Sequence, residues 1–516
     1  MGQSNSGRTN KFIKNVIGSA VLQIVTIVTG FISPKLMLGA FGSEINGITS
    51  SILQFISYIS LVEAGLANAT VFALYKPLAK KDIKERDAVI SASRISYRNI
   101  GLIFVLLSVV LAAVYPFIGK TDALNYGELF ILVLILCASG TLNFFILAKY
   151  RTLLTADQCS YAISYSSAVQ LVVYIVLIYG AIKLNWGIIA VRAVGVLPMF
   201  LTALILYIFV KCRYGKINFY EKPNMKALDQ RWNAMFLQIL GVVRSGAPVV
   251  IMTWILDFKL ISVYTIYNMI AGSITTCISV FTSGLSASFG DIYATGDKKL
   301  LHKSTEEFRT AFYILITIVY TVMLVTLMPF ISLYTEGITD ANYYLPLFGI
   351  LITLNGLLDN MKAPHGMLVF SFGKFKVVKK QNMIQAVIII VLGVVFTYLW
   401  GLVGIMAALC ISNLYMLVEM LRITPKYLVD MSIRKNIFQL IRMFVIVFGL
   451  YFLCLSFGYV PTTYVQWLIY AVIVGVIAVA VTLGTTLIFE YETMKSLWRR
   501  AKFVVSNKFS KTGDEP

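Results

Sequence analysis

Long runs of apolar residues, separated by short polar breaks, extend along almost the whole chain. The run 127–148, for example, carries a single charged residue, Glu128, near its start. A helix rises about 1.5 Å per residue, so a run of this length crosses a hydrocarbon core about 30 Å thick. Because many such runs follow one another, the pattern predicts an all-α membrane protein that crosses the bilayer repeatedly.

The apolar runs and the charged breaks between them predict about fourteen transmembrane helices. The turns near 256–260 and 400–402 are the tightest, since the chain must reverse there within a few residues. With boundaries good to about four residues, the expected spans are 14–38, 48–75, 89–118, 127–148, 160–182, 187–210, 232–256, 260–290, 308–334, 342–372, 378–400, 402–421, 437–457 and 464–489.

The distribution of Lys and Arg supports this number of spans. When the N-terminus is placed in the cytoplasm, 37 of the 44 Lys and Arg fall in or beside cytoplasmic segments. The outer loops hold Lys120, Lys183 and Lys259. Cytoplasmic loops of membrane proteins are rich in Lys and Arg, so both termini are expected in the cytoplasm. This topology also accounts for the net charge of +20, and we expect no nucleic-acid partner.

The composition agrees with a membrane protein. Hydrophobic residues make up 58% of the chain and charged residues 13%, whereas soluble domains carry about 25% charged residues. The six cysteines are far apart, there are two histidines, and no Walker A sequence is present. We therefore expect no disulfide framework, no metal site and no cofactor. No catalytic group of residues is visible either, which favours a transporter over an enzyme.

A weak internal repeat suggests two lobes. The spans 14–38 and 232–256 carry Pro34 and Pro248 and are each followed by a short break. Six helices per lobe would give parallel repeats with a cavity between them. The expected segments are a cytoplasmic N-terminus (1–13), a first six-helix lobe (14–212), a cytoplasmic loop (213–231), a second six-helix lobe (232–425), two additional helices (437–489) and a basic cytoplasmic tail (490–516). The tail after Trp498 is expected to be disordered or to lie on the lipid surface.

Three short segments near the N-terminus carry a distinctive pattern. They are LGAFGSEING at 38–47, LVEAGLANA at 61–69 and LYKPLA at 74–79, followed by Asp82. Over roughly the first hundred residues, the chain resembles the Wzx-type polysaccharide flippases of the multidrug/oligosaccharidyl-lipid/polysaccharide (MOP) exporter superfamily. The resemblance implies two MATE-like six-helix bundles with two extra helices, alternating access, and a lipid-linked oligosaccharide as cargo.

Such a cargo needs a hydrated path with fixed positive charge, because a pyrophosphate and a sugar cannot cross hydrocarbon unsolvated. Charged residues at membrane depth are therefore candidates for the path. Arg244 lies about halfway along the span 232–256, close to the small residues Gly241 and Ala247 and to Pro248. It could contact the cargo, or it could form a buried ion pair that locks the lobes.

Two further spans carry polar residues at membrane depth. Glu63 could couple transport to a proton or ion, pair with Arg244, or serve helix packing. In the span 342–372, Asn355, Asp359 and Lys362 share one helix face. Their stripe could line the path, or Asp359 and Lys362 could neutralise each other. His365 lies one turn onward, next to Pro364, which could kink the helix.

Three positions near the membrane surfaces have simpler explanations. Lys35, beside Pro34, could contact phosphate at an outer gate or extend to the headgroups, as long basic side chains do. Arg192 has the same two interpretations. Glu419 and Arg422 lie close together in the sequence, and a local ion pair explains them best.

The leading hypothesis is a flippase that moves an undecaprenyl-pyrophosphate-linked oligosaccharide from the inner to the outer leaflet of the bacterial cell membrane. A polysaccharide polymerase is a further candidate partner. The nearest alternative is a drug or cation antiporter of the same superfamily, the MATE type, in which an acidic pocket is expected. A membrane enzyme, such as a polymerase or an acyltransferase, would need a sizeable outer loop or clustered His and Arg, and neither is present.

Overall fold

The computed structural model contains the whole chain and describes residues 2–63, 65–118, 121–225 and 231–510. These residues are almost entirely helical, and no β-strand occurs among them. The prediction of an all-α protein is confirmed.

The chain forms two compact units. Unit 1 comprises Met1–Ile266 together with Ile338–Ala341, and unit 2 comprises Tyr267–Gly337 together with Asn342–Pro516. The chain leaves unit 1 within α10, and α9, which contacts α1, lies in unit 1. The division into six-helix lobes stays a prediction.

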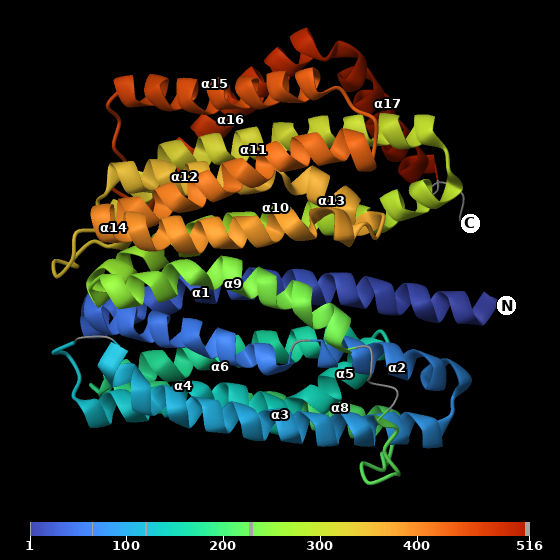
Figure 1. Cartoon of the computed structure of the whole chain (residues 1–516), viewed down its shortest axis with the longest axis vertical. Coiled ribbons are helices and arrows are strands. Elements are labelled where there is room, and N and C mark those ends of the chain that lie inside the picture. Colours follow the sequence, from blue (N-terminus) through green and yellow to red (C-terminus); the bar gives the residue numbers. More distant parts are fainter. Residues whose placement is uncertain (1, 64, 119–120, 226–230, 511–516) are drawn as a thin grey trace. The chain divides into compact units, whose positions relative to one another are not determined.

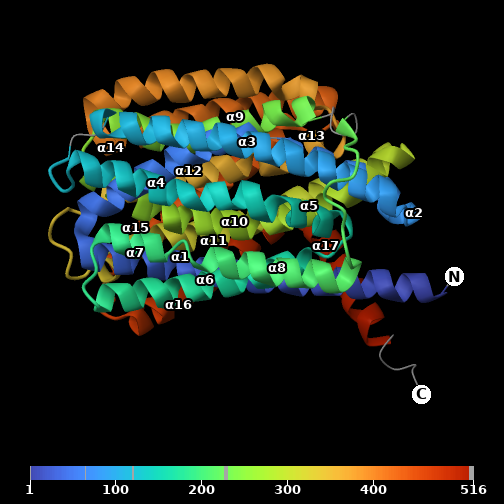
Figure 2. The ribbon, with the colours of Figure 1, turned by 90° about the horizontal axis from the view of Figure 1, so that it is seen from below.

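Unit 1 contains the N-terminal helices. In two views of this unit, α3 lies beside α4 and α6 lies beside α8 (Figure 1 and Figure 2). Its elements are α1 (Gly2–Ile59), the 3-10 turn η1 (Ser60–Glu63), α2 (Leu66–Lys80), α3 (Ile83–Ile118), α4 (Tyr126–Leu142), the π-helical turn η2 (Asn143–Leu147), α5 (Ala148–Ala156), α6 (Ser160–Lys183), α7 (Ile188–Val194), α8 (Pro198–Tyr214), α9 (Arg231–Ile255) and the first part of α10 (Phe258–Thr295).

Unit 2 contains the rest of α10 and the C-terminal helices. Both α15 and α16, the two helices beyond the expected lobes, contact α11. The elements of unit 2 after α10 are α11 (Lys298–Tyr334), α12 (Pro346–Met361), α13 (Ala363–Ser371), α14 (Phe375–Tyr427), α15 (Ile433–Ser456), α16 (Tyr464–Phe489) and α17 (Tyr491–Ser510).

The long α1 is two helices joined at Gly42. The backbone of this residue has φ 78° and ψ 177°, outside the helical region, and glycine adopts such angles at low cost because it has no Cβ. Figure 1 shows the second half of α1 running back toward α2. The predicted spans 14–38 and 48–75 are therefore separate crossings.

The long α14 reverses in the same way at Gly401, where φ is 57° and ψ is −132°. A Cβ on Gly404 would lie only 1.8 Å from the carbonyl oxygen of Phe396. Residues eight apart in a straight helix are separated by about 12 Å, so the chain must fold back here. The tight turn predicted near 400–402 is confirmed.

The predicted number of spans also agrees with the described helices. Ten helical segments are long and apolar enough to cross a membrane, and those holding the turns at Gly42 and Gly401 contain two spans each. The remaining two predicted spans correspond to α9 and to α12 with α13. The chain is therefore a multi-pass membrane protein with about fourteen transmembrane helices.

The exposed side of α16 is apolar, as expected for a helix that faces lipid. Val465, Leu468 and Val472 are all more than half exposed, whereas Val474 and Ala478 on the opposite side are buried. In water, exposed apolar side chains in such a continuous band would favour aggregation. Against acyl chains they incur no such penalty.

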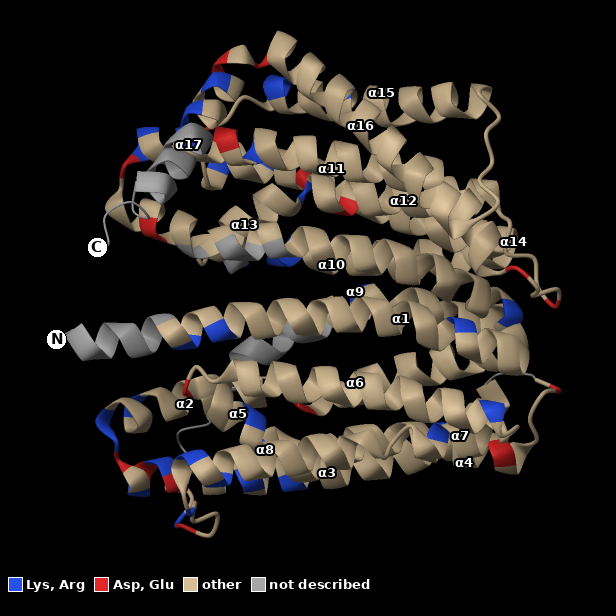
Figure 3. Cartoon of the chain, turned by 180° about the vertical axis from the view of Figure 1, so that it is seen from behind, with Lys and Arg blue, Asp and Glu red and all other residues tan. Residues whose placement is uncertain are grey.

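Charged side chains gather at the helix ends. Figure 3 shows most Lys and Arg of unit 1 at the end where α2 turns into α3, and those of unit 2 near α17. This arrangement agrees with the sequence bias from which cytoplasmic termini were predicted.

The segment after α16 differs from the expected tail. Residues 491–510 are helical, and Arg500 forms an ion pair with Glu307 of α11 at 2.8 Å. Ser496 donates a hydrogen bond to the same carboxylate. Of the two alternatives for the tail after Trp498, disorder does not hold for residues 499–510, because α17 is helical and is anchored to the buried Glu307. Its placement on the lipid surface stays a prediction.

Candidate functional site

Arg244 lies near the middle of α9 and is exposed. The following residues, Gly246, Ala247 and Pro248, are buried. Gly246 lies against Gln54 of α1 so closely that a Cβ would be 2.1 Å from the side-chain nitrogen of Gln54. These small residues therefore let α9 approach α1 closely, directly beside Arg244.

Glu63 ends η1 and is partly buried within unit 1. The groups that act on its carboxylate are the hydroxyl of Tyr97 from α3 and the guanidinium of Arg151 from α5. Arg151 also donates to the side-chain oxygen of Asn143 at 3.0 Å, in the π-helical turn. Arg151, and not Arg244, is therefore the cation next to Glu63.

The polar stripe of α12 forms a connected cluster in unit 2. The ammonium of Lys362 lies 2.8 Å from the carboxylate of Asp359 and donates to the side-chain oxygen of Asn413 at 2.5 Å. Asn413 in turn donates to Asn355 at 2.8 Å and accepts from Gln385 at 3.1 Å. Both interpretations of the stripe remain compatible with this geometry, because Asp359 and Lys362 neutralise each other within a larger polar network.

The helix breaks beside this cluster. Lys362 separates α12 from α13, and Pro364 occupies the first turn of α13. His365 is buried, with its Nδ1 3.0 Å from the hydroxyl of Thr424. The predicted kink is therefore present, and the break places Lys362 where it reaches α14.

The three surface candidates differ in their surroundings. Lys35 is exposed on α1. Arg192 is partly buried and donates to the hydroxyl of Tyr174 at 3.1 Å. Glu419 and Arg422 form the predicted ion pair at 3.2 Å. The roles proposed for Lys35 and Arg192 stay predictions.

Two further charged clusters were not found from the sequence. In unit 1, Arg94 of α3 and Lys149 of α5 lie near each other, and Arg151 lies near Glu63. In unit 2, the buried Glu490 accepts hydrogen bonds from Arg442 and Gln439. The signal in the sequence was the pair Lys149 and Arg151 directly after an apolar run, which we interpreted only as an orientation signal.

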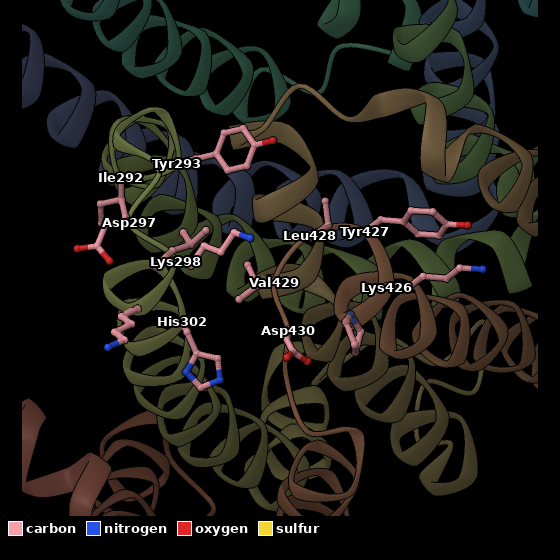
Figure 4. Close-up of a pocket in the computed structure, with 14 residues that line it drawn as sticks. Ile292, Tyr293, Asp297, Lys298, His302, Lys426, Tyr427, Leu428, Val429 and Asp430 are labelled. Atoms are coloured by element: carbon pink, nitrogen blue, oxygen red, sulfur yellow. The ribbon is translucent and has the colours of Figure 1, made fainter.

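A pocket of about 710 Å³ opens at the end of unit 2 where α11 begins. Lys298 and His302 face it from α11, and Asp430 faces it from the segment between α14 and α15 (Figure 4). Its lining mixes basic and acidic side chains with the rings of Tyr293 and Tyr427. None of the candidates predicted from the sequence lines it.

No known protein-family profile matches the sequence, and no curated protein does. Several solved structures are similar in fold. The lipid II flippase MurJ in an inward closed conformation has a TM-score of 0.66 at 14% identity, covering 93% of this chain and 100% of MurJ. An inward-facing multidrug resistance MATE family transporter of the MOP superfamily has a TM-score of 0.58 at 14% identity, covering 82% of this chain and 98% of its own.

A third similar structure is a MOP superfamily transporter from Pyrococcus furiosus, with a TM-score of 0.51 at 12% identity, covering 84% of this chain and 96% of its own. All three are membrane transporters by name. At these identities the likeness concerns the fold. The chain has the fold of the multidrug/oligosaccharidyl-lipid/polysaccharide exporter superfamily.

Proposed function

We propose that this chain is a flippase of the Wzx type, which moves an undecaprenyl-pyrophosphate-linked oligosaccharide from the inner to the outer leaflet of the bacterial cell membrane by alternating access. Both termini lie in the cytoplasm. The oligosaccharide then becomes available on the outer face to a polysaccharide polymerase.

The observation that carries this proposal is the exposure of Arg244 in the middle of α9. An arginine facing acyl chains at the centre of a bilayer is costly, by about 3 kcal/mol or more. Water and an anionic group would remove this cost. An exposed guanidinium at this depth therefore supports a hydrated passage that accepts a negatively charged cargo.

Unit 2 supplies a second group suited to a phosphorylated cargo. Lys362 is buried but touches Asp359, whose side chain is about a third exposed. A pyrophosphate could compete with Asp359 for the ammonium of Lys362. Cargo binding would then rearrange the polar network around this lysine.

The membrane potential supplies part of the driving force. An anionic headgroup that leaves a negative-inside cell gains about 2.3 kcal/mol per charge for each 100 mV. A pyrophosphate carrying two negative charges would thus gain about 4–5 kcal/mol if its charge crossed the whole field uncompensated. A cationic drug expelled from the cell would have to move against the same field.

The proposal is tested by replacing Arg244 in a strain that depends on this chain for its surface glycan. We expect Arg244→Ala to abolish surface glycan while the amount of protein in the membrane stays unchanged, and Arg244→Lys to retain part of the activity. Arg422→Ala is the matched control, since Arg422 is exposed and pairs with the nearby Glu419. Normal surface glycan in the Arg244→Ala strain would contradict the role of this residue.

A drug or cation antiporter of the MATE type is the second candidate, because the fold also resembles MATE family transporters. The two functions separate in proteoliposomes. A flippase moves a fluorescent prenyl-pyrophosphate-linked oligosaccharide across the bilayer, and its expression leaves drug susceptibility unchanged. Extrusion of cationic dyes without movement of the labelled lipid would favour the antiporter.

A further inference from the structure

Two cations at the Lys- and Arg-rich end of unit 1 form no ion pair with any described acidic residue. Arg94 projects from α3, and its guanidinium stacks on the ring of Tyr220 at 4.1 Å from the ring centroid. One of its nitrogens donates to the carbonyl oxygen of Phe219 at 3.1 Å. Lys149, from α5, places its ammonium 4.9 Å from the centre of the Phe219 ring and 5.1 Å from that of Tyr150.

The two cations are close enough to disfavour each other electrostatically. Among the described residues, neither forms an ion pair, and the ammonium of Lys149 donates no hydrogen bond. Two adjacent like charges in a partly buried setting call for a counter-ion. An anion that contacts both the ammonium and the guanidinium would remove this repulsion.

The nearby acidic groups are already used to hold the loop that carries the two rings. Asp87 is buried, pairs with Arg86 at 2.7 Å and accepts from the backbone N–H of Asn218 at 3.0 Å. Glu221 accepts from the side chain of Asn218. The segment 215–225 is thus held against α3 through Asp87, and it presents Phe219 and Tyr220 to the two cations.

From this arrangement we propose that Arg94 and Lys149 form a binding site for the phosphodiester of an anionic phospholipid from the cytoplasmic leaflet. Tyrosine and other aromatic side chains prefer the headgroup level of a bilayer, and clustered Lys and Arg at this level attract anionic lipids. Arg94 supplies a planar donor suited to two phosphate oxygens, while Lys149 supplies a point charge. This site lies in unit 1 and does not depend on the proposed function of the chain.

The test measures which lipids stay bound to the purified protein. Wild type and variants are reconstituted in nanodiscs of mixed phosphatidylglycerol and phosphatidylethanolamine, and bound lipid is counted by native mass spectrometry after detergent release. We expect wild type to retain phosphatidylglycerol selectively. The double variant Arg94→Gln/Lys149→Gln should bind it about tenfold more weakly, as loss of two charge-assisted contacts implies.

Two controls separate a specific site from a general charge effect and from misfolding. Arg98→Gln removes an exposed arginine one turn further along α3 and should leave lipid retention unchanged. Arg94→Lys/Lys149→Arg keeps both charges and should restore most of the binding. Equal loss of lipid in the Arg98→Gln variant would overturn the proposal.

A soluble phosphate or diphosphate ion is the alternative occupant of this site. Inorganic phosphate and inorganic diphosphate, added to protein in neutral detergent, should raise the unfolding temperature by less than short-chain phosphatidylglycerol does. If the soluble ions stabilise the wild type but not the double variant, and phosphatidylglycerol has no effect, the site binds a soluble anion and the lipid assignment is wrong.

Discussion

The ammonium of Lys362 and the side-chain oxygen of Asn413 lie 2.5 Å apart, which joins the break between α12 and α13 to the second half of α14. Asn413 also bridges to Asn355 and Gln385. A single amide therefore holds together three segments that are remote in sequence. This relationship explains why a lysine at the end of a membrane helix can be buried next to an aspartate.

Replacing Asn413 with Leu should destabilise unit 2 by about 2–3 kcal/mol, because Lys362 and Gln385 would lose their acceptor in a buried setting. Leucine has a similar size, so the loss reflects hydrogen bonding rather than an empty space. The measurement is thermal unfolding in detergent. Asn382→Leu, on the same helix with one bond to the carbonyl of Val378, should cost less than 1 kcal/mol, on the order of a single partly exposed bond.

Gly47 tolerates no side chain, although it lies inside a helix. A Cβ there would be 1.8 Å from the carbonyl oxygen of Phe258 at the start of α10. Gly47→Ala should therefore separate α1 from this turn and lower stability by about 3 kcal/mol, as strong overpacking does. A Cβ at Gly39 would have no heavy atom within 4 Å. Gly39→Ala should therefore leave stability unchanged or raise it slightly. A Gly47→Ala protein as stable as Gly39→Ala would show that the two helices can move apart freely.

The sequence predicted the spans well because a bilayer imposes a simple rule, that every crossing needs a long apolar helix. It also predicted a tight turn near 400–402 and a kink at Pro364, but not that Gly401 makes the turn or that the helix breaks at Lys362. It could not predict which polar groups meet. Asn413 is one of several asparagines in apolar runs, and its role depends on α14 folding back at Gly401.

The charged network that holds the last helices was missed for the same reason. Thr310 and Arg442 come from two different helices and Glu490 from the junction of α16 and α17, and nothing in their spacing indicates that they meet. Arg94 and Lys149 appeared only as members of the cytoplasmic charge bias. The number of Lys and Arg in a segment does not show which of them are surrounded by solvent and which lie together in a partly buried site.

Glu490 is the anchor of the two additional helices. Its carboxylate, buried at the end of α16, pairs with Arg442 of α15 and accepts from Thr310 of α11 at 2.8 Å. Glu490→Ala leaves Arg442 as an uncompensated buried charge, for which a cost of about 3 kcal/mol is expected. Hydrogen exchange should rise in α15 to α17 while unit 1 stays protected. Glu492→Ala, which removes an exposed carboxylate two residues later, serves as the control.

Asp157 ties together three ends of unit 1 in the turn between α5 and α6. Its carboxylate lies 3.0 Å from Lys11 of α1 and 3.0 Å from Arg213 of α8, and it accepts from the hydroxyl of Tyr214 at 2.7 Å. Burial by itself raises the pKa of Asp157, but the hydrogen bonds from Tyr214 and Lys11 outweigh burial. The pKa in the folded protein is therefore held below the ordinary value of 3.8.

Because the pKa of Asp157 is lowered in the folded protein, acid should weaken the stabilisation that this carboxylate provides. The unfolded chain binds a proton to Asp157 more readily than the folded chain, so the stabilisation is complete well above pH 3.8 and is lost as the pH falls through the folded pKa. Asp157→Asn should cost about 1–2 kcal/mol near neutral pH, since the contacts are partly exposed. The difference in unfolding temperature between wild type and Asp157→Asn should be constant from about pH 8 to about pH 5 and should shrink below about pH 4. Asp122→Asn, at an exposed carboxylate, should show no such difference at any pH. If the difference in unfolding temperature between wild type and Asp157→Asn instead grew as the pH falls, the carboxylate would be protonated more easily in the folded protein than in the unfolded chain.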